Sequence, residues 1–445
     1  MSYYSEALPY HTDSAKYYAV LADLPWAVWL DSGGLARYDI ITAMPIHTIV
    51  LDAETLKGDP FTALRMQLGE VVTSQENVPF AGGALGIWGY DLACRMMGVS
   101  SAKRTGGDLP GMIVGIYDWA LVVDHHLLTA KLVSHQRFAE TAKLLPRILS
   151  LLEAEQVVPE DDFSVYGPIT SNFSPPEYAS AFSMVQGYLQ SGDCYQINLA
   201  QCFSAKAEGN ALSAYFKLRS MNPAPYGAFL KFPQAQIICN SPERFVSVRG
   251  VRVETKPIKG TRRRSSDTNE DMQLAAELGR HPKDRAENLM IVDLLRSDLG
   301  KVCVPGSVKT PKLFDVESYA NVHHLVSTVE GQISAGNDAL DVLRACFPGG
   351  SVTGAPKLRA MQIIDQLEPH RRGFYCGVIG YIGFDRNMDS NIAIRSMVHS
   401  GKEIRCWAGG GIVADSDVDA EYQETLDKAS AMLELLRQFG GEVMR

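Results

Sequence analysis

Three glutamates in helix-favouring segments are the first indication of chemistry in this chain. Glu421 and Glu424 lie three residues apart in a run, 420–438, that predicts a closing helix, so they share one face of it. Glu287 lies in a second helical run, 283–295. Neither run contains histidine or cysteine, so oxygen ligands for a hard ion such as Mg²⁺ are one interpretation, and solvated helix carboxylates are the other.

Two further side chains could transfer protons or form covalent bonds. Lys259 lies in Thr-Lys-Pro-Ile-Lys-Gly-Thr, residues 255–261, where the alternative is a strand end with two solvated lysines. Glu243, in Ser-Pro-Glu-Arg-Phe at 241–245, could act as a general acid or could simply pair with Arg244 at the start of a strand.

Two glycine-rich segments could bind an anion. Residues 349–357 lack the adjacent Gly-Lys of a phosphate loop, because Ala355 and Pro356 intervene. Residues 409–414 are followed by only 31 residues, too few for a dinucleotide fold. A tight turn and a cradle of backbone N–H groups remain as interpretations of both.

Periodicity predicts the elements that must position these residues. Ser174, two prolines and Glu177 predict a helix start, and Gly192 is a plausible stop. Residues 155–173 predict a linker between two parts. Strands are predicted at 80–90, 115–124, 196–203, 226–232, 236–239, 245–254, 376–384, 391–398 and 403–408, and further helices at 271–278, 283–295, 338–346, 356–367 and 420–438. Strands and helices in no regular βαβ order favour an α+β fold.

Composition excludes several classes of protein. The chain has 46% hydrophobic and 21% charged residues, which is typical of globular proteins, and a net charge of -9, which does not favour nucleic-acid binding. Its eight cysteines contain no C-x-x-C pair and predict reduced core residues of a cytoplasmic protein. The sequence contains no apolar run of about 18 residues, so no membrane span is predicted.

Seven segments together resemble the successive blocks of the chorismate-binding family. They are residues 195–201, 241–245, 257–261, 284–293, 322–327, 347–357 and 408–416. Residues 24–26, 80–90 and 115–120 resemble the branch of that family that makes 4-amino-4-deoxychorismate. One departure is Arg296-Ser297-Asp298, where the family usually has Asn at the middle position.

The resemblance implies a fold and a division of the chain. The expected fold is like that of anthranilate synthase component I: α+β, with two associated subregions of β-sheet backed by helices. Residues 1–160 would form an N-terminal component I-like region, and residues 174–438 the chorismate-binding catalytic region.

The resemblance also implies an activity. The chain would be an enzyme, an aminodeoxychorismate synthase, that converts chorismate and ammonia to 4-amino-4-deoxychorismate for 4-aminobenzoate and folate biosynthesis. Ammonia would come from a separate glutamine amidotransferase subunit, because the chain has no second segment of glutaminase size. Binding to nucleic acid or membrane is not expected.

Roles for individual residues follow from the same resemblance. Mg²⁺ on Glu287 and Glu424, with Glu421 nearby, would bind the ring carboxylate. Glu243 would protonate the departing 4-hydroxyl while Lys259 attacks C2, and ammonia would then displace the lysine. The other expected substrate contacts are Thr261, His324, Tyr375, Arg395, Gly409, Gly410 and Gly411.

Alternatives remain within and outside the family. Anthranilate synthase component I usually has alanine where this chain has Lys259, and isochorismate synthase is a further relative. A non-catalytic chorismate-binding subunit is an alternative of another class. Residues 26–32 also resemble part of a tryptophan pocket found in some relatives, with Ser32 as a contact, although an ordinary buried strand explains them equally well.

Overall fold

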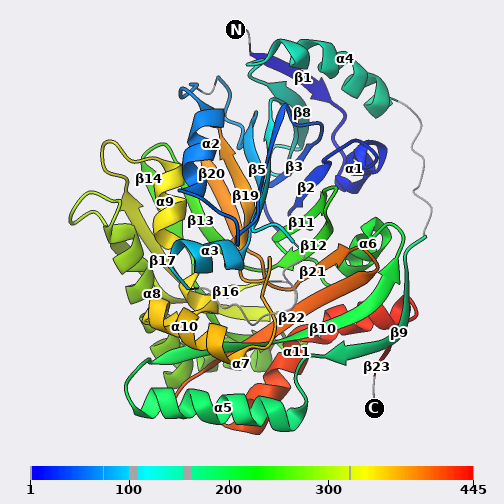
Figure 1. The fold of residues 1–445 in the computed structure, drawn as a ribbon. Coiled ribbons are helices and arrows are strands. Elements are labelled where there is room, and N and C mark those ends of the chain that lie inside the picture. The colour runs from blue at the N-terminus through cyan, green and yellow to red at the C-terminus, as the bar shows by residue number, and fades with distance from the viewer. Residues whose placement is uncertain (1–2, 74, 100–108, 154–161, 320–321, 444–445) are drawn as a thin grey trace.

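Two large β-sheets form the frame of the molecule (Figure 1). The computed structural model describes residues 3–73, 75–99, 109–153, 162–319 and 322–443. Within these residues the first sheet has thirteen strands and the second has ten, and nearly all pairings are antiparallel. Helices cover the outer faces, which confirms the expected α+β class.

The strands of each sheet come from distant parts of the chain. In spatial order the first sheet contains β1 (Tyr4–Leu8), β8 (Thr129–Ser134), β7 (Ala120–Asp124), β3 (Tyr38–Thr42), β2 (Val28–Asp31), β11 (Tyr226–Lys231), β12 (Gln236–Ser241), β21 (Ser396–Ser400), β22 (Glu403–Ile412), β10 (Gln196–Glu208), β9 (Ser164–Ser171) and β23 (Glu442–Val443), with β18 (Gly354–Ala355) paired to β10. The second contains β15 (Ile258–Arg263), β17 (Val322–Gln332), β14 (Arg252–Thr255), β13 (Arg244–Arg249), β20 (Met388–Ile392), β19 (Val378–Gly383), β5 (Gly83–Trp88), β6 (Met112–Tyr117) and β4 (His47–Leu51), with β16 (Lys309–Ser318) paired to β17. The regions expected at 1–160 and 174–438 therefore supply strands to both sheets.

The helices pack on both sheets. They are α1 (Ala15–Leu21), α2 (Pro60–Leu68), α3 (Tyr90–Met96), α4 (Ala139–Glu153), α5 (Pro175–Gln190), α6 (Leu212–Met221), α7 (Thr268–Arg280), α8 (Pro282–Gly300), α9 (Ala339–Cys346), α10 (Lys357–Leu367) and α11 (Val418–Gln438). Helix α11 packs on β22, and α8 packs on β15 and β17. These two helices carry the glutamates that the sequence singled out.

Helix α5 begins where the sequence predicted. Ser174 is the N-cap, and its backbone N–H donates to the Glu177 carboxylate at 2.8 Å, so the capping box is formed. The helix ends at Gln190, and Gly192 follows in the left-handed region with φ of +77°. Glycine tolerates that conformation without steric cost, which explains the stop.

Three predicted strands are in fact pairs of strands. Residues 115–124 contribute to β6 in the second sheet and β7 in the first, and residues 391–398 contribute to β20 in the second sheet and β21 in the first. Residues 245–254 form the hairpin β13–β14, which turns at Gly250. At the two junctions between sheets the strands on both sides are mostly buried, so the apolar run continues through the corner and periodicity does not reveal it, whereas the hairpin turns through the exposed residues 249–252.

The linker predicted over 155–173 is wrong in its second half. Residues 164–171 form strand β9, which pairs with β10 and lengthens the first sheet. The first part of that stretch, through residue 161, lies outside the described residues. The proline and polar residues of this stretch favoured a linker in the prediction. Strand β9 nevertheless accommodates them, because it lies near the end of the sheet, where one face and one edge tolerate such residues.

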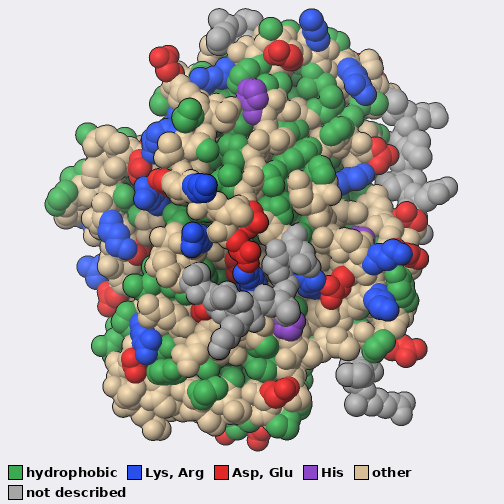
Figure 2. All heavy atoms as spheres, viewed as in Figure 1, with side chains coloured by type: hydrophobic (Ala, Val, Ile, Leu, Met, Phe, Trp, Pro, Cys, Tyr) green, Lys and Arg blue, Asp and Glu red, His purple; other side chains and the backbone are tan. Residues whose placement is uncertain are grey.

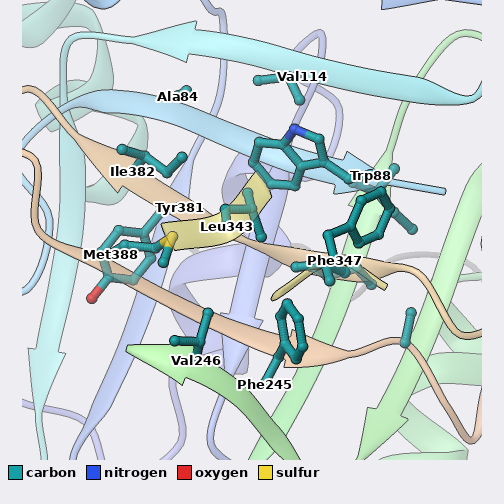
Figure 3. Packing of buried hydrophobic residues seen from close by; sticks show 14 of the residues in the cluster. Ala84, Trp88, Val114, Phe245, Val246, Leu343, Phe347, Tyr381, Ile382 and Met388 are labelled. Atoms are coloured by element: carbon teal, nitrogen blue, oxygen red, sulfur yellow. The ribbon is translucent and has the colours of Figure 1, made fainter. Parts of the chain in front are cut away.

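The core of the second sheet is built from large apolar side chains (Figure 3). Trp88, Phe245 and Phe347 lie close together, and Leu343 of α9 packs against the same cluster. All eight cysteines are buried and none forms a disulfide, as the sequence predicted. This packing fixes α9 and the strands that lead into the interior of the molecule.

The described helices include no candidate membrane span, and the face drawn in Figure 2 shows no basic stripe among the described residues. No helix in the described ranges is long and apolar enough to cross a membrane. On the face seen in Figure 2, basic and acidic side chains of the described residues are interspersed. This distribution agrees with the net charge of -9.

The core packing gives a direct test. Leu343→Ala removes a side chain that is 1% exposed, so we expect a loss of about 2–5 kcal/mol in the free energy of unfolding. Leu358→Ala, at a position that is 43% exposed, is the control and should change stability by less than about 0.5 kcal/mol. Denaturant unfolding followed by circular dichroism measures both, and equal losses would contradict the assignment of Leu343 to the core.

Candidate active site

A cavity of about 700 Å³ lies where the two sheets, α8 and α11 meet. Two of its wall segments are crossings of the chain from one sheet to the other. Pro242 and Glu243 connect β12 to β13, and residues 393–395 connect β20 to β21. The crossings are tied together, because the Asn240 N–H donates to the Arg395 carbonyl at 3.1 Å and the Ile392 N–H to the Glu243 carbonyl at 3.1 Å.

Most of the predicted site residues meet in this cavity. Those that line it are Glu243, Lys259, Thr261, Glu287, His324, Tyr375, Arg395, Gly409, Gly411, Glu421 and Glu424. Gly410 does not line the cavity, and a Cβ there would be 2.8 Å from Glu421 Oε2. Ser32 does not line the cavity; it is buried, and its N–H donates to Asp39 Oδ1 at 2.7 Å. Binding of tryptophan at Ser32 stays a prediction.

Glu243 is a buried acid. Its side chain is only 7% exposed, and Oε1 accepts a hydrogen bond from the Ser351 hydroxyl at 3.2 Å. Burial raises the pKa of this carboxyl to about 7, although the nearby charge of Lys259 opposes the shift. Arg244 does not pair with Glu243; it bonds Asp389 and Glu254. A carboxyl with such a pKa can donate a proton near neutral pH.

A β-bulge aims Lys259 into the cavity. In the pairing of β15 with β17, Ile258 lies opposite Val326 and Thr261 opposite His324, so β15 contains one extra residue between these pairs. Gly260 has φ of +79°, and a Cβ there would be 2.8 Å from Asp284 Cγ. The bulge therefore needs glycine and lets β15 lie tightly on α8.

The amine of Lys259 has an acidic neighbour on α8. Its Nζ lies 3.7 Å from Glu287 Oε2. Lys256, the other lysine of residues 255–261, bonds Glu317 at 3.0 Å. The position of Lys259 beside Glu287 and within the electrostatic reach of Glu243 is consistent with a chemical role.

The glutamates of α11 have different environments. Glu421 Oε1 accepts from the Ser416 hydroxyl at 2.6 Å, whereas its buried Oε2 has no hydrogen-bond partner, and burial raises its pKa. For Glu424, burial acts in the same direction, but Lys428 at 2.5 Å outweighs it and the pKa is lowered. The pKa values of these two neighbouring carboxyls are thus shifted in opposite directions.

The donor set suits a magnesium ion that is completed by substrate and water. Among the described residues, no three His, Cys, Asp or Glu side chains are grouped closely enough to hold a metal by themselves. However, Mg²⁺ is usually bound through one or two carboxylates, with other oxygens supplied by water or ligand. The unpartnered Glu421 Oε2 and the adjacent Glu424 carboxyl fit that pattern.

The triglycine segment is a strand and not a tight turn. Residues 409–411 of β22 pair with β10 on one edge, whereas the pairing of β22 with β21 ends at Cys406. The other edge of this segment therefore has no strand partner among the described residues, and Gly409 and Gly411 line the cavity. Such an edge without a strand partner can supply backbone groups to an anionic ligand.

The remaining predicted contacts, Thr261, His324, Tyr375 and Arg395, take part in three separate interactions. Thr261 Oγ1 lies 2.9 Å from His324 Nδ1, and burial lowers the pKa of this histidine and so favours its neutral form. Tyr375 stacks on Trp407 with ring centroids 6.2 Å apart. Arg395 Nη1 donates to the Lys428 carbonyl at 2.5 Å, which ties the second crossing to α11.

Several lining residues were missed in the sequence. Lys428 could have been found, because it lies four residues after Glu424 on a predicted helix. Trp407 precedes the glycine segment that had drawn attention. Ser351 and Asn198 carry no local signal, since their proximity to Glu243 and to Gly409 exists only in the folded chain.

The fold and the cavity together define an enzyme with a buried acid, an amine and carboxylates around one small-molecule site. The chain belongs to the family of chorismate binding enzymes, whose model matches residues 27–434. Aminodeoxychorismate synthase component 1 of Escherichia coli (strain K12) is 46% identical over 97% of this chain and 98% of the relative. The same component of Klebsiella aerogenes is 44% identical over 97% and 98%.

A solved structure gives the same fold. Anthranilate synthase component I from Streptococcus pneumoniae TIGR4 superposes with a TM-score of 0.80 at 33% identity, covering 89% of this chain and 92% of that chain. The anthranilate synthase component I-like fold expected from the sequence is thereby confirmed.

Burial of Glu243 predicts a pH-dependent effect on stability. The unfolded carboxyl ionises at about 4.5 and the folded one at about 7, so wild-type stability falls by up to about 3 kcal/mol between those values. Glu243→Gln lacks this group, so we expect it to match the wild type near pH 4 and to exceed it at pH 8. Unfolding curves at both pH values measure the difference, and a constant difference would contradict the raised pKa.

Proposed function

We propose that this chain is component 1 of an aminodeoxychorismate synthase, which converts chorismate and ammonia to 4-amino-4-deoxychorismate and water for 4-aminobenzoate and folate biosynthesis. The observation that carries the proposal is Lys259, aimed by its bulge into the family's chorismate cavity at the position where anthranilate synthases usually have alanine. Relatives with this name that match almost the whole chain support it. Catalysis is assigned to residues 174–438.

Substrate binding requires neutralisation of two carboxylates. Arg395 and Tyr375 are proposed to hold the enolpyruvyl carboxylate, since a guanidinium can grip a carboxylate through two hydrogen bonds. Thr261 and backbone groups of residues 409–411 would contact the ring carboxylate, and His324 would orient the ring. Glu424 and Glu287, with Glu421, would hold Mg²⁺, which when bound supplies positive charge to the ring carboxylate.

The reaction needs an acid and a nucleophile. Glu243 donates a proton to the 4-hydroxyl of chorismate, which leaves as water, while the neutral amine of Lys259 bonds to C2. Ammonia then bonds to C4 and Lys259 leaves C2, so the ring double bonds return to their places. The proton lost by the incoming nitrogen restores Glu243, and the sum is chorismate plus ammonia giving product plus water.

A second protein is proposed to supply the ammonia. The name of the relatives includes the word component, and a glutamine amidotransferase subunit is the source of ammonia that the chemistry requires. We also propose a cytoplasmic location, which the eight buried cysteines, none of them in a disulfide, support.

Anthranilate synthase component I is the second candidate, because the Streptococcus pneumoniae structure bears that name at 33% identity. Isochorismate synthase and a non-catalytic chorismate-binding subunit are the others. All four candidates bind chorismate, so only the product separates them. The acid, amine and carboxylates gathered in one cavity favour an enzyme over a binding subunit.

The purified chain should convert chorismate with ammonium and Mg²⁺ to 4-amino-4-deoxychorismate, identified by mass and by reaction with a lyase specific for that product. Chelation of the metal should abolish turnover. Glutamine should replace ammonium only when the amidotransferase is added, because no glutaminase site is proposed on this chain. Anthranilate or isochorismate as the main product would refute the proposal, and so would glutamine-dependent turnover by the chain alone.

Lys259→Ala should lose the covalent route but still bind chorismate, because Arg395 and the carboxylate-bound cation supply most of the anion binding. Slow attack of ammonia at C2 should then shift the product toward 2-amino-2-deoxyisochorismate or anthranilate. Lys259→Arg should not restore activity, since a guanidinium stays protonated. The decisive measurement is a peptide digest after incubation with chorismate without ammonia, in which the wild type should carry an adduct on Lys259. An unmodified Lys259 and a fully active arginine variant would refute the nucleophile role.

A further inference from the structure

Arg372 is a charged side chain with no exposed surface, and it lies between α10 and β19. Its Nη2 and Nε donate to the two carboxylate oxygens of Glu368, at 2.6 and 2.9 Å. The same guanidinium donates to the Val352 carbonyl at 2.8 Å through Nη1 and to the Asn198 carbonyl at 2.7 Å through Nη2. These four bonds join parts of the chain that are up to 174 residues apart.

The groups bound by Arg372 are walls of the cavity. Asn198 and Val352 both line it, the first from β10 and the second from the short helix at Gly350–Val352. The guanidinium also lies 5.6 Å from the ring centroid of Tyr375, a third lining residue, and the Tyr375 N–H donates to the Arg372 carbonyl at 3.0 Å. On the other side it lies 4.7 Å from the ring of Tyr90.

Glu368 extends the connection into the first sheet. Its Oε1, which accepts from Arg372, also accepts from the Ala200 N–H at 2.9 Å. Ala200 lies opposite Gly409 in the pairing of β10 with β22. The ion pair thus reaches β10, the strand that pairs with the glycine segment lining the cavity.

Stability alone does not account for this ion pair. Burying two charges is expensive, and apolar residues of similar volume are often neutral or stabilising in place of such a pair. A guanidinium, however, is a planar fork that can hold several acceptors in fixed directions, which an apolar side chain or a lysine cannot do. The arrangement is suited to fixing positions.

We propose that Arg372, held by Glu368, is a positioning residue that sets the relative placement of the cavity walls at Asn198, Val352 and Tyr375. Val352 follows Ser351, whose hydroxyl donates to Glu243, so the position of this helix also determines the hydrogen bond of the proposed acid. Arg372 itself does not line the cavity. The inference rests on the proposed function only in the choice of reaction, the consumption of chorismate, that is used to test it.

The chain offers a matched control. Arg386 is 8% exposed, pairs with Asp338 at 3.3 Å, and donates to the carbonyls of Phe384 and Gly69. None of these four residues lines the cavity. Arg372→Lys and Arg386→Lys therefore remove the same kind of buried guanidinium network, once beside the cavity and once away from it.

The test measures chorismate consumption, chorismate affinity by calorimetry and the thermal unfolding midpoint for both variants and the wild type. We expect comparable falls in the midpoint. We expect kcat/KM to fall about 100-fold in Arg372→Lys, because small displacements of catalytic groups have effects of that size, and to stay within about threefold of the wild type in Arg386→Lys. The pH dependence of kcat should also shift in Arg372→Lys alone, through the Ser351–Glu243 bond.

The inference would be overturned if kcat/KM fell in proportion to the thermal midpoint to the same extent in both variants. It would also be overturned if Arg372→Lys kept near-wild-type activity. If Arg372→Lys is insoluble, Glu368→Gln decides the matter, since it keeps the side-chain volume but loses the charge that orients Arg372. At least a tenfold fall in kcat/KM is then expected, and full activity would overturn the inference. Consumption and affinity do not depend on which product forms, so a different product refutes the proposed function without deciding the role of Arg372.

Discussion

The cavity depends on one feature of the chain path: the polypeptide passes from one sheet to the other at two adjacent places. Residues 242–243 pass from β12 to β13, and residues 393–395 pass back from β20 to β21. Backbone hydrogen bonds join the two passages, at 3.1 Å in each direction. Side chains at a passage belong to neither sheet's packed face, so Glu243 and Arg395 can point into the space between the sheets. Glu243, the proposed acid, and Arg395, which is proposed to bind a substrate carboxylate, are held near each other by this pair of hydrogen bonds.

The sequence predicted the chemical groups better than the frame that brings them together. Glu421 and Glu424 share a helix face by spacing alone, and Gly260 within a strand is a sign of the bulge that aims Lys259. Two passages between the sheets were missed, at 118–119 and 393–395, because residues 115–124 and 391–398 read as continuous apolar strands. Ser351 and Arg372 were missed for another reason: their partners lie 108 and up to 174 residues away, and no local pattern encodes such contacts.

The amines and carboxylates that line the cavity lie beside each other in pairs of opposite charge. Lys259 lies by Glu287, Lys283 lies 3.9 Å from Glu421, and Lys428 lies by Glu424. A cavity lined by one sign alone would hold a dianion or a cation, but not both in one complex. Alternating amines and carboxylates can accept a dianionic substrate together with a divalent ion while each buried charge keeps a counter-charge, which is the condition for burial at acceptable free energy.

This distribution bears on the timing of proton transfer. Burial holds the pKa of Glu243 at about 7, so the free site contains both protonation states near neutral pH. In the proposed reaction the substrate adds two carboxylates to the same enclosed space. Negative charge disfavours ionisation of a neighbouring carboxyl. The carboxylates of chorismate therefore favour the protonated acid, which is the form that can release the 4-hydroxyl as water, whereas Mg²⁺ and Arg395 act in the opposite direction. The substrate that needs the proton thus helps to keep it in place, and the site does not require a strongly acidic medium to act.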